Sequence, residues 1–170
     1  GAKVLLICMK AEWERYPYAQ IQVVQNPREE TLWRTNYYIP LWPQAALVPR
    51  DPDRGDCFKN IAFLGNPENL APELKTESWQ QQLKDIGLCW KPILDRACWN
   101  DYREIDATLA VRSFNKKMLY TKENFITKPA TKLYNSWRAG VPALLGCEAA
   151  FQAERKSELD YLGLLWTRPP

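Results

Sequence analysis

The sequence predicts an α/β fold, a Rossmann-like parallel sheet with helices on both faces, preceded by a fragment of a second lobe. Short apolar runs typical of strands buried on both faces alternate with stretches of helical period, as in doubly wound parallel sheets. A proline-rich segment at 36–56 cannot hold a long helix or a central strand, so it indicates a crossing between lobes. We place an N-terminal lobe at 1–48 and a C-terminal lobe at 49–170.

Composition excludes several classes of protein. The net charge of the 170 residues is only +3 and both signs alternate, so we expect no nucleic-acid partner. No apolar run approaches the roughly 18 residues of a transmembrane helix, so we expect no transmembrane segment. The five cysteines lack metal spacing and indicate reduced thiols in a cytoplasmic protein, without a metal or another cofactor. The absence of histidine excludes an imidazole base or ligand.

The elements of the N-terminal lobe follow from apolar runs and turn residues. Apart from Lys3 at its start, the range 3–9 is continuously apolar and predicts a strand buried on both faces. Residues 11–18 predict a turn or a short helix, and residues 21–25 a second buried strand. Pro27 then opens a short helix, with acidic residues in its first turn that suit the helix dipole.

The elements of the C-terminal lobe are bounded by glycines and prolines. Glycines that follow an apolar or helical run mark where each element stops. The expected elements are a strand at 60–64, a loop at 67–72, a helix at 76–86, a strand at 88–90, helical turns at 92–98, a strand at 107–111, a polar loop at 113–127, a strand at 143–145, a helix at 148–161 and a tail at 163–170 that joins no element.

Residues 125–146 are the stretch around which the chain is organised. Pro129 suits a first helical turn, where its missing N–H would be unpaired in any case. Gly140 is expected to end this helix in a left-handed conformation. The apolar face of the helix is predicted to comprise Ala130, Leu133 and Trp137.

An anion site is predicted beside this helix. Lys128 and Lys132 flank its start, where unpaired N–H groups and the helix dipole favour phosphate or pyrophosphate. Ligands of doubly wound sheets bind outside the carboxyl ends of the strands. That rule adds Gly65 and Arg112 to the site, together with Glu148, whose carboxylate would match a ribose or sugar hydroxyl. The alternative, lysines that are merely solvated, stays open.

The arginines of the crossing segment, and the tryptophans of the whole chain, each allow two interpretations. Arg50 and Arg54 could reach an anion, or they could form salt bridges with the neighbouring aspartates. The aromatic residues Tyr37, Tyr38 and Trp42 are expected to pack between the lobes. The eight tryptophans can line a ligand pocket, although packing in the core or between lobes is the commoner use of this residue.

The motif KPATKLYNSWRAGVPAL, after a buried strand ending in AVR, resembles the donor-binding lobe of two-Rossmann-domain (GT-B) glycosyltransferases. NIAFLG is similar to the first strand and loop of that lobe, ESWQQQLKDIGL to its first helix, and IQVVQNP to the last strand of the acceptor lobe. The resemblance covers about residues 58–160 in useful detail.

The resemblance implies a role for several residues. Lys128 and Lys132 would lie near the pyrophosphate of a nucleotide-diphosphate sugar. Asn135 takes the position at which retaining members often place a ribose-binding glutamate, and Thr127 the position of the first acid of their glutamate pair. Because that pair is absent, retaining or inverting chemistry stays undecided.

The leading hypothesis is therefore a glycosyltransferase, or a fragment of one, that transfers a sugar from a nucleotide-diphosphate donor to an unknown acceptor. The resemblance implies a truncated chain, because a complete enzyme needs a whole acceptor lobe and further bracing helices. One alternative is a nucleotide- or phosphosugar-binding module without catalysis. Another is a structural or interaction domain, with Trp42, Trp79 and Trp99 at a protein–protein interface.

Overall fold

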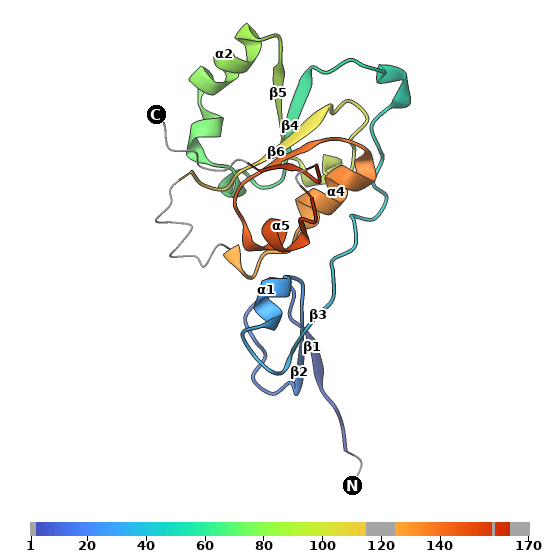
Figure 1. Cartoon of the computed structure of the whole chain (residues 1–170), viewed down its shortest axis with the longest axis vertical. Helices are drawn as coiled ribbons and strands as arrows, with labels where there is room; N and C mark the ends of the chain where they lie inside the picture. Colours follow the sequence, from blue (N-terminus) through green and yellow to red (C-terminus); the bar gives the residue numbers. More distant parts are fainter. Residues whose placement is uncertain (1–2, 115–124, 158, 164–170) are drawn as a thin grey trace.

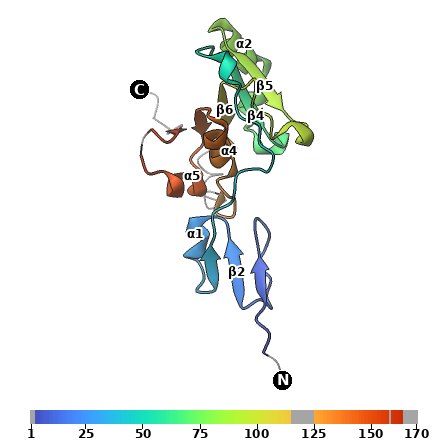
Figure 2. The same ribbon diagram turned by 90° about the vertical axis from the view of Figure 1, so that its right-hand side faces the viewer.

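A computed structural model of the chain describes residues 3–114, 125–157 and 159–163, and it contains two parallel sheets (Figure 1). The N-terminal lobe has three strands in the order β1-β2-β3, and the C-terminal lobe has five in the order β5-β4-β6-β7-β8. Every strand pair is parallel. The predicted Rossmann-like α/β fold is confirmed. Figure 2 shows the two lobes end to end, joined by one crossing segment.

The N-terminal lobe consists of β1 (Ile7–Met9), β2 (Ile21–Val24), the short helix α1 (Pro27–Glu30) and β3 (Asn36–Tyr38). Its central strand β2 is largely buried, and α1 begins at the predicted proline. The prediction that 3–9 is a strand buried on both faces is wrong. Only 7–9 form a strand, and its apolar side chains are exposed because β1 lies at the edge of the sheet, away from α1, which packs against β2 and β3.

The crossing segment contains no long helix and no central strand, as predicted; apart from β3 at its start it holds only the 3₁₀ turn η1 (Pro52–Arg54). Val48 forms a parallel bridge with Asp101 of the C-terminal lobe. Of the aromatic residues expected between the lobes, Tyr38 contacts the C-terminal lobe by donating a hydrogen bond to Glu154. Trp42 is 82 % exposed, so the expectation that it packs between the lobes is wrong.

The C-terminal sheet contains β4 (Asn60–Leu64), β5 (Cys89–Ile93), β6 (Ala107–Ala110), β7 (Ala143–Leu145) and β8 (Leu162–Gly163). β4 pairs with both β5 and β6, so the direction in which the chain adds strands reverses between β4 and β6. Such a reversal opens a crevice at the carboxyl ends of the two strands, where doubly wound proteins bind their ligands.

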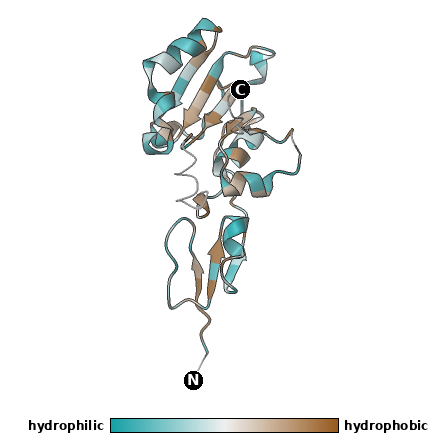
Figure 3. Cartoon of the chain, turned by 60° about the vertical axis from the view of Figure 1, so that its left-hand side comes forward, coloured by the Kyte–Doolittle hydropathy of each residue, from teal (hydrophilic) through white to brown (hydrophobic). Residues whose placement is uncertain are grey.

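Helices cover both faces of this sheet. On one face α2 (Glu77–Asp85) lays Trp79 against a core that contains Ile61, Phe63 and Leu109. On the other face α4 (Thr131–Ala139) and α5 (Ala149–Glu154) pack against β6 and β7 through a second apolar cluster. Figure 3 shows the strands as the most apolar elements and α2 as a largely polar surface helix.

Two glycines end helices as predicted. Gly87 follows α2 with a φ of 78°, and Gly140 follows α4 with a φ of 71°. The start of α4 differs from the prediction, because Ala130 is its N-cap and Pro129 lies before the first turn. The predicted apolar face is buried at Ala130 and Leu133, but Trp137 is half-exposed and donates its indole N–H to a backbone carbonyl.

Four further features differ from the prediction. Pro92 lies in β5 rather than in a helix, which is allowed because β5 is an edge strand; the 3₁₀ turn η4 (Arg96–Cys98) follows it. The helix expected at 148–161 is shorter, and Gly163 of the supposedly unstructured tail pairs with β7. The loop after β4 forms the 3₁₀ turns η2 (Pro67–Asn69) and η3 (Pro72–Lys75). Most of the polar loop predicted at 113–127 lies outside the described residues.

Arg50 and Arg54 anchor the crossing segment to the C-terminal sheet. Both ion-pair with Asp106, at 3.0 Å and 2.7 Å, rather than with neighbouring aspartates. Asp106 also accepts the backbone N–H groups of Lys59 and Asn60. This cluster lies at the amino end of β6, the end opposite the crevice.

Within the described ranges, no helix has the length and apolar character needed to span a bilayer.

Candidate functional site

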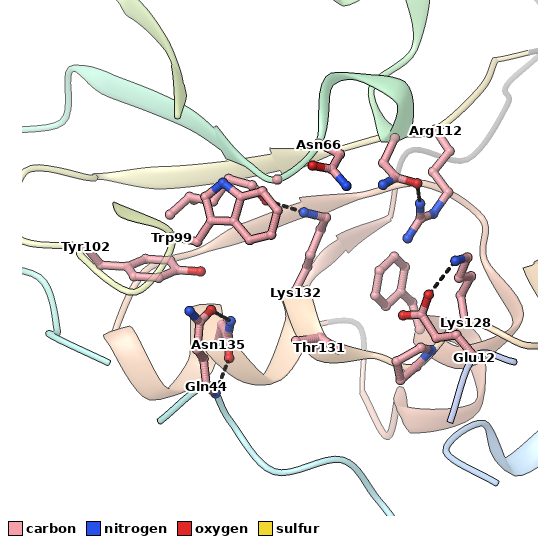
Figure 4. Close-up of a pocket in the computed structure, with 15 residues that line it drawn as sticks. Glu12, Gln44, Asn66, Trp99, Tyr102, Arg112, Lys128, Thr131, Lys132 and Asn135 are labelled. Carbon is pink, nitrogen blue, oxygen red and sulfur yellow. Dashed lines mark hydrogen bonds and ion pairs between the residues drawn. The ribbon is translucent and has the colours of Figure 1, made fainter. Parts of the chain in front are cut away.

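A cavity of about 250 Å³ lies at the carboxyl ends of β4 and β6, where the strand order reverses (Figure 4). Both lobes and the first turns of α4 contribute to its wall. The residues that line it are Glu12, Gln44, Leu64, Gly65, Asn66, Asn69, Trp99, Tyr102, Arg112, Lys128, Pro129, Thr131, Lys132, Asn135 and Phe151.

The start of α4 opens onto this cavity. Thr131 and Lys132 of the first turn line the wall, and so do the two residues before the N-cap. No described side chain caps the helix. As far as the described residues show, the first backbone N–H groups, with the positive end of the helix dipole, are therefore available to an anion.

Lys132 forms the middle of the cavity wall. Its Nζ donates a hydrogen bond to the carbonyl oxygen of Leu64 and stands 4.5 Å above the ring of Phe63. Burial, and then the positive charge of Arg112, lower the pKa of the Lys132 amine to about 8. Lys132 is thus held in place by the last residues of β4.

Gly65 makes room for this amine. It has a φ of +151°, a conformation that glycine adopts far more readily than other residues. A Cβ at this position would lie 2.8 Å from Lys132 Nζ. The predicted site residue thus has a steric role, because a side chain here would displace the lysine.

Gly65→Ala is expected to lower the free energy of unfolding by about 1–3 kcal/mol, since alanine would be strained in this backbone conformation. Chemical denaturation measures the loss. Gly146→Ala is the matched control, because Gly146 also follows a strand but has no positive φ, and a Cβ there would meet its nearest atom at 3.5 Å. Equal losses in the two variants would contradict the assignment.

Arg112 connects the cavity to a buried carboxylate. Its Nε donates to Glu148 at 3.0 Å, and its Nη1 donates to the side chain of Asn69. Glu148 is only 3 % exposed, and burial raises the pKa of its carboxyl although Arg112 and Lys132 oppose this rise. The structure therefore places Glu148 behind Arg112, outside the residues that line the cavity.

Lys128 binds the N-terminal lobe at the mouth of the cavity. Its amine forms an ion pair with Glu12, and its backbone carbonyl accepts a hydrogen bond from the Asn26 side chain at 3.0 Å. Figure 4 shows Glu12 and Lys128 side by side at one end of the cavity, with Lys132 toward its centre. An incoming anion would therefore compete with Glu12 for Lys128.

Asn135 lies toward the other end of the cavity, in a network of neutral polar groups. Its side-chain oxygen accepts the backbone N–H of Gln44 at 2.8 Å, and the two amide side chains face each other at 3.4 Å. Nearby, burial raises the pKa of Tyr102 to about 12, although a hydrogen bond with Asn135 opposes the rise. Figure 4 places Trp99 beside this group, so this end is aromatic and uncharged.

No protein-family model, curated protein or solved structure matches this chain. Among the described residues, no group of three or more cysteine, aspartate or glutamate side chains is arranged to hold a metal ion. Anion binding through side chains and backbone N–H groups is the chemistry that the geometry supports.

The structure brings most of the predicted site residues together at one cavity. Five of the six predicted residues, Gly65, Arg112, Lys128, Lys132 and Asn135, line one cavity, and Glu148 contacts it through Arg112. Ten of the fifteen lining residues were not predicted as site residues, among them the polar or aromatic Glu12, Gln44, Trp99 and Tyr102. Glu12 and Gln44 carry no sequence signal. The two aromatic residues had one weak signal, a cluster of large rings in an irregular segment between two strands.

Proposed function

We propose that this chain binds the diphosphate of a nucleotide-diphosphate sugar in this cavity, as a glycosyltransferase or a fragment of one. The observation that supports the proposal is the convergence of three cationic side chains and an uncapped helix start on the carboxyl edge of the sheet. Helix starts and cationic side chains are the groups with which α/β proteins bind phosphates.

In such a transfer, negative charge develops on the leaving diphosphate. Arg112 and Lys132 are already held by neighbouring groups, so they need little reorganisation to stabilise that charge. Lys128 would exchange Glu12 for a phosphate oxygen. Side chains and a helix dipole can supply this stabilisation without a divalent cation.

The neutral end of the cavity suits the rest of the donor. Amide groups such as those of Gln44 and Asn135 hydrogen-bond ribose or sugar hydroxyls, and Trp99 offers an aromatic surface. The volume of about 250 Å³ is slightly below the roughly 300–1,000 Å³ of small-molecule pockets. We therefore expect the diphosphate inside and part of the donor extending toward the acceptor, whose identity stays open.

A second candidate is a nucleotide- or phosphosugar-binding module without catalysis. One observation favours it. Glu12 is the only carboxylate that lines the cavity among the described residues, and its ion pair with Lys128 occupies it. A carboxylate base therefore has no free candidate within the described part of the chain. Assaying nucleotide sugars for transfer or hydrolysis separates the two candidates, because a binding module would show saturable binding and no turnover.

Lys128→Ala is expected to weaken the binding of UDP or GDP by about 1–3 kcal/mol, because it removes one charged hydrogen bond to the diphosphate. Isothermal titration calorimetry at low ionic strength measures the change. Lys91→Ala is the control. Lys91 lies on the edge strand β5, pairs with Glu104 and does not line the cavity.

Unchanged affinity of the Lys128 variant would argue against the proposed site. A wild-type chain that binds neither nucleotide, with no change in tryptophan fluorescence, would favour a structural or interaction domain instead. Trp99 is the natural reporter, because its ring lines the cavity.

A further inference from the structure

The amine of Lys132 has surroundings unlike those of the other cavity lysine. Lys128 lies at the mouth, partly exposed and paired with a carboxylate. Lys132 is anchored on a carbonyl oxygen and an aromatic ring, and no carboxylate in the described part of the chain forms an ion pair with it. A lysine that is desolvated and placed near another cation is an activated nucleophile.

The charged groups that surround this amine come from four different segments. Arg112 follows β6, Glu148 precedes α5, Lys128 precedes α4, and Glu12 comes from the N-terminal lobe. The arginine disfavours the ammonium form, and the two glutamates favour it. Burial makes the largest contribution and lowers the pKa of Lys132 to about 8. A minor fraction of the Lys132 amine is therefore neutral, and able to act as a nucleophile, near pH 7.

We propose that Lys132 is a covalent attachment site for small phosphorylated aldehydes or ketones. The phosphate would bind Arg112 and the open start of α4, which places the carbonyl carbon beside Lys132 Nζ. The hydrogen bond to Leu64 orients the nitrogen, because a neutral amine can donate one hydrogen there and keep its lone pair for the ligand.

The reaction is the formation of an imine. The nitrogen lone pair of neutral Lys132 attacks the carbonyl carbon, and a proton moves from nitrogen to the former carbonyl oxygen to give a carbinolamine. Loss of that oxygen as water leaves a C=N bond. One amine and one carbonyl are consumed, one imine and one water are formed, and no oxidant or reductant is needed.

This inference goes beyond the proposed function and does not require it. Both concern the same cations, so a nucleoside diphosphate and a phosphorylated carbonyl compound would compete. Imine formation would remove the free amine and close the cavity to the diphosphate. The chemistry therefore adds a modification site to the cavity, whether or not the chain transfers sugars.

Pyridoxal 5′-phosphate is the probe, with borohydride reduction to fix the imine and peptide mass analysis to locate it. We expect one equivalent on Lys132, formed at least tenfold faster than on any other lysine. The rate should fall as the pH is lowered below about 8, because the amine becomes protonated. Pyridoxal, which lacks the phosphate, should react at least tenfold more slowly.

Lys132→Arg keeps the positive charge and cannot form the imine, so it should lose the fast label while its unfolding curve stays close to that of the wild type. Lys128→Arg should keep the label. Modification spread evenly over surface lysines, a fast label that survives in Lys132→Arg, or equal rates for pyridoxal and its phosphate would each overturn the proposal. Selective labelling that UDP does not slow would support this inference and count against the proposed function.

Discussion

Asp106→Ala is expected to lower the free energy of unfolding by about 3–5 kcal/mol, the cost of removing one partner from a buried ion pair. Asp106 is 1 % exposed and neutralises both Arg50 and Arg54. Its loss would also leave the backbone N–H groups of Lys59 and Asn60 without this acceptor. Denaturation in urea, followed by tryptophan fluorescence, measures the change.

The control for this variant is Asp101→Ala. Asp101 pairs with Arg103 at 2.6 Å, but Arg103 is well exposed and Asp101 is partly exposed. Exposed pairs of this kind contribute at most about 1 kcal/mol. A similar loss in the two variants would show that Asp106 is not a buried anchor of the crossing segment.

The same aspartate should make stability depend on acid pH. Burial disfavours its charge, but hydrogen bonds from Arg54, from two backbone N–H groups and from Arg50 outweigh burial and hold the pKa of Asp106 well below its usual value. Its contribution is therefore complete above the unfolded-state pKa of about 4 and is lost as the pH falls below it. The acid-induced loss of stability should be smaller in Asp106→Asn than in the wild type.

Arg112→Met is expected to have the second large effect, a loss of about 3–5 kcal/mol in the free energy of unfolding at pH 7, because it leaves the carboxylate of Glu148 buried without its counter-charge. It should also weaken diphosphate binding, since a cation of the cavity is gone. Thermal unfolding and calorimetric titration measure the two effects separately.

A second substitution tests the cause of this loss. Glu148→Gln in the Arg112→Met background removes the unpaired charge, so it should recover much of the stability but none of the diphosphate affinity. Burial already raises the pKa of Glu148. Its ionisation therefore destabilises the fold as the pH rises, and the single Arg112 variant should regain stability on acidification. If neither Glu148→Gln nor acidification restored stability to the Arg112→Met variant, the buried ion pair between Arg112 and Glu148 would be contradicted.

Both predictions concern the ends of β6. Asp106 precedes its first residue and binds the crossing segment, whereas Arg112 follows its last residues and faces the cavity. One end of the strand therefore stabilises the connection between the lobes, and the other positions the proposed anion site.

Local sequence patterns predicted the elements and the edge of the sheet that holds the site. The buried strands at 60–64, 107–111 and 143–145 were found because apolar runs indicate burial directly. Gly65 and Arg112 could be assigned to one rim because the carboxyl ends of parallel strands share an edge.

Predictions from the sequence were wrong where the burial of a strand or the pairing of a side chain depends on residues far away in the chain. The apolar run at 3–9 was expected in a core, but its place at a sheet edge leaves it exposed. Pro92 predicted a helix and lies in an edge strand, because an edge tolerates a missing donor. The arginines of the crossing segment bind Asp106, which is more than fifty residues away in the chain.

The sequence by itself therefore determined the α/β class, most strands and helices, and which residues could bind an anion, since these follow from the local period, glycine and proline positions and strand direction. Only the tertiary structure decided which charges neutralise one another: Glu12 with Lys128, Glu148 with Arg112, and Asp106 with two arginines. The physical reason is that an ion pair is fixed by distance and burial, and residues that are far apart in the sequence acquire both only when the chain folds.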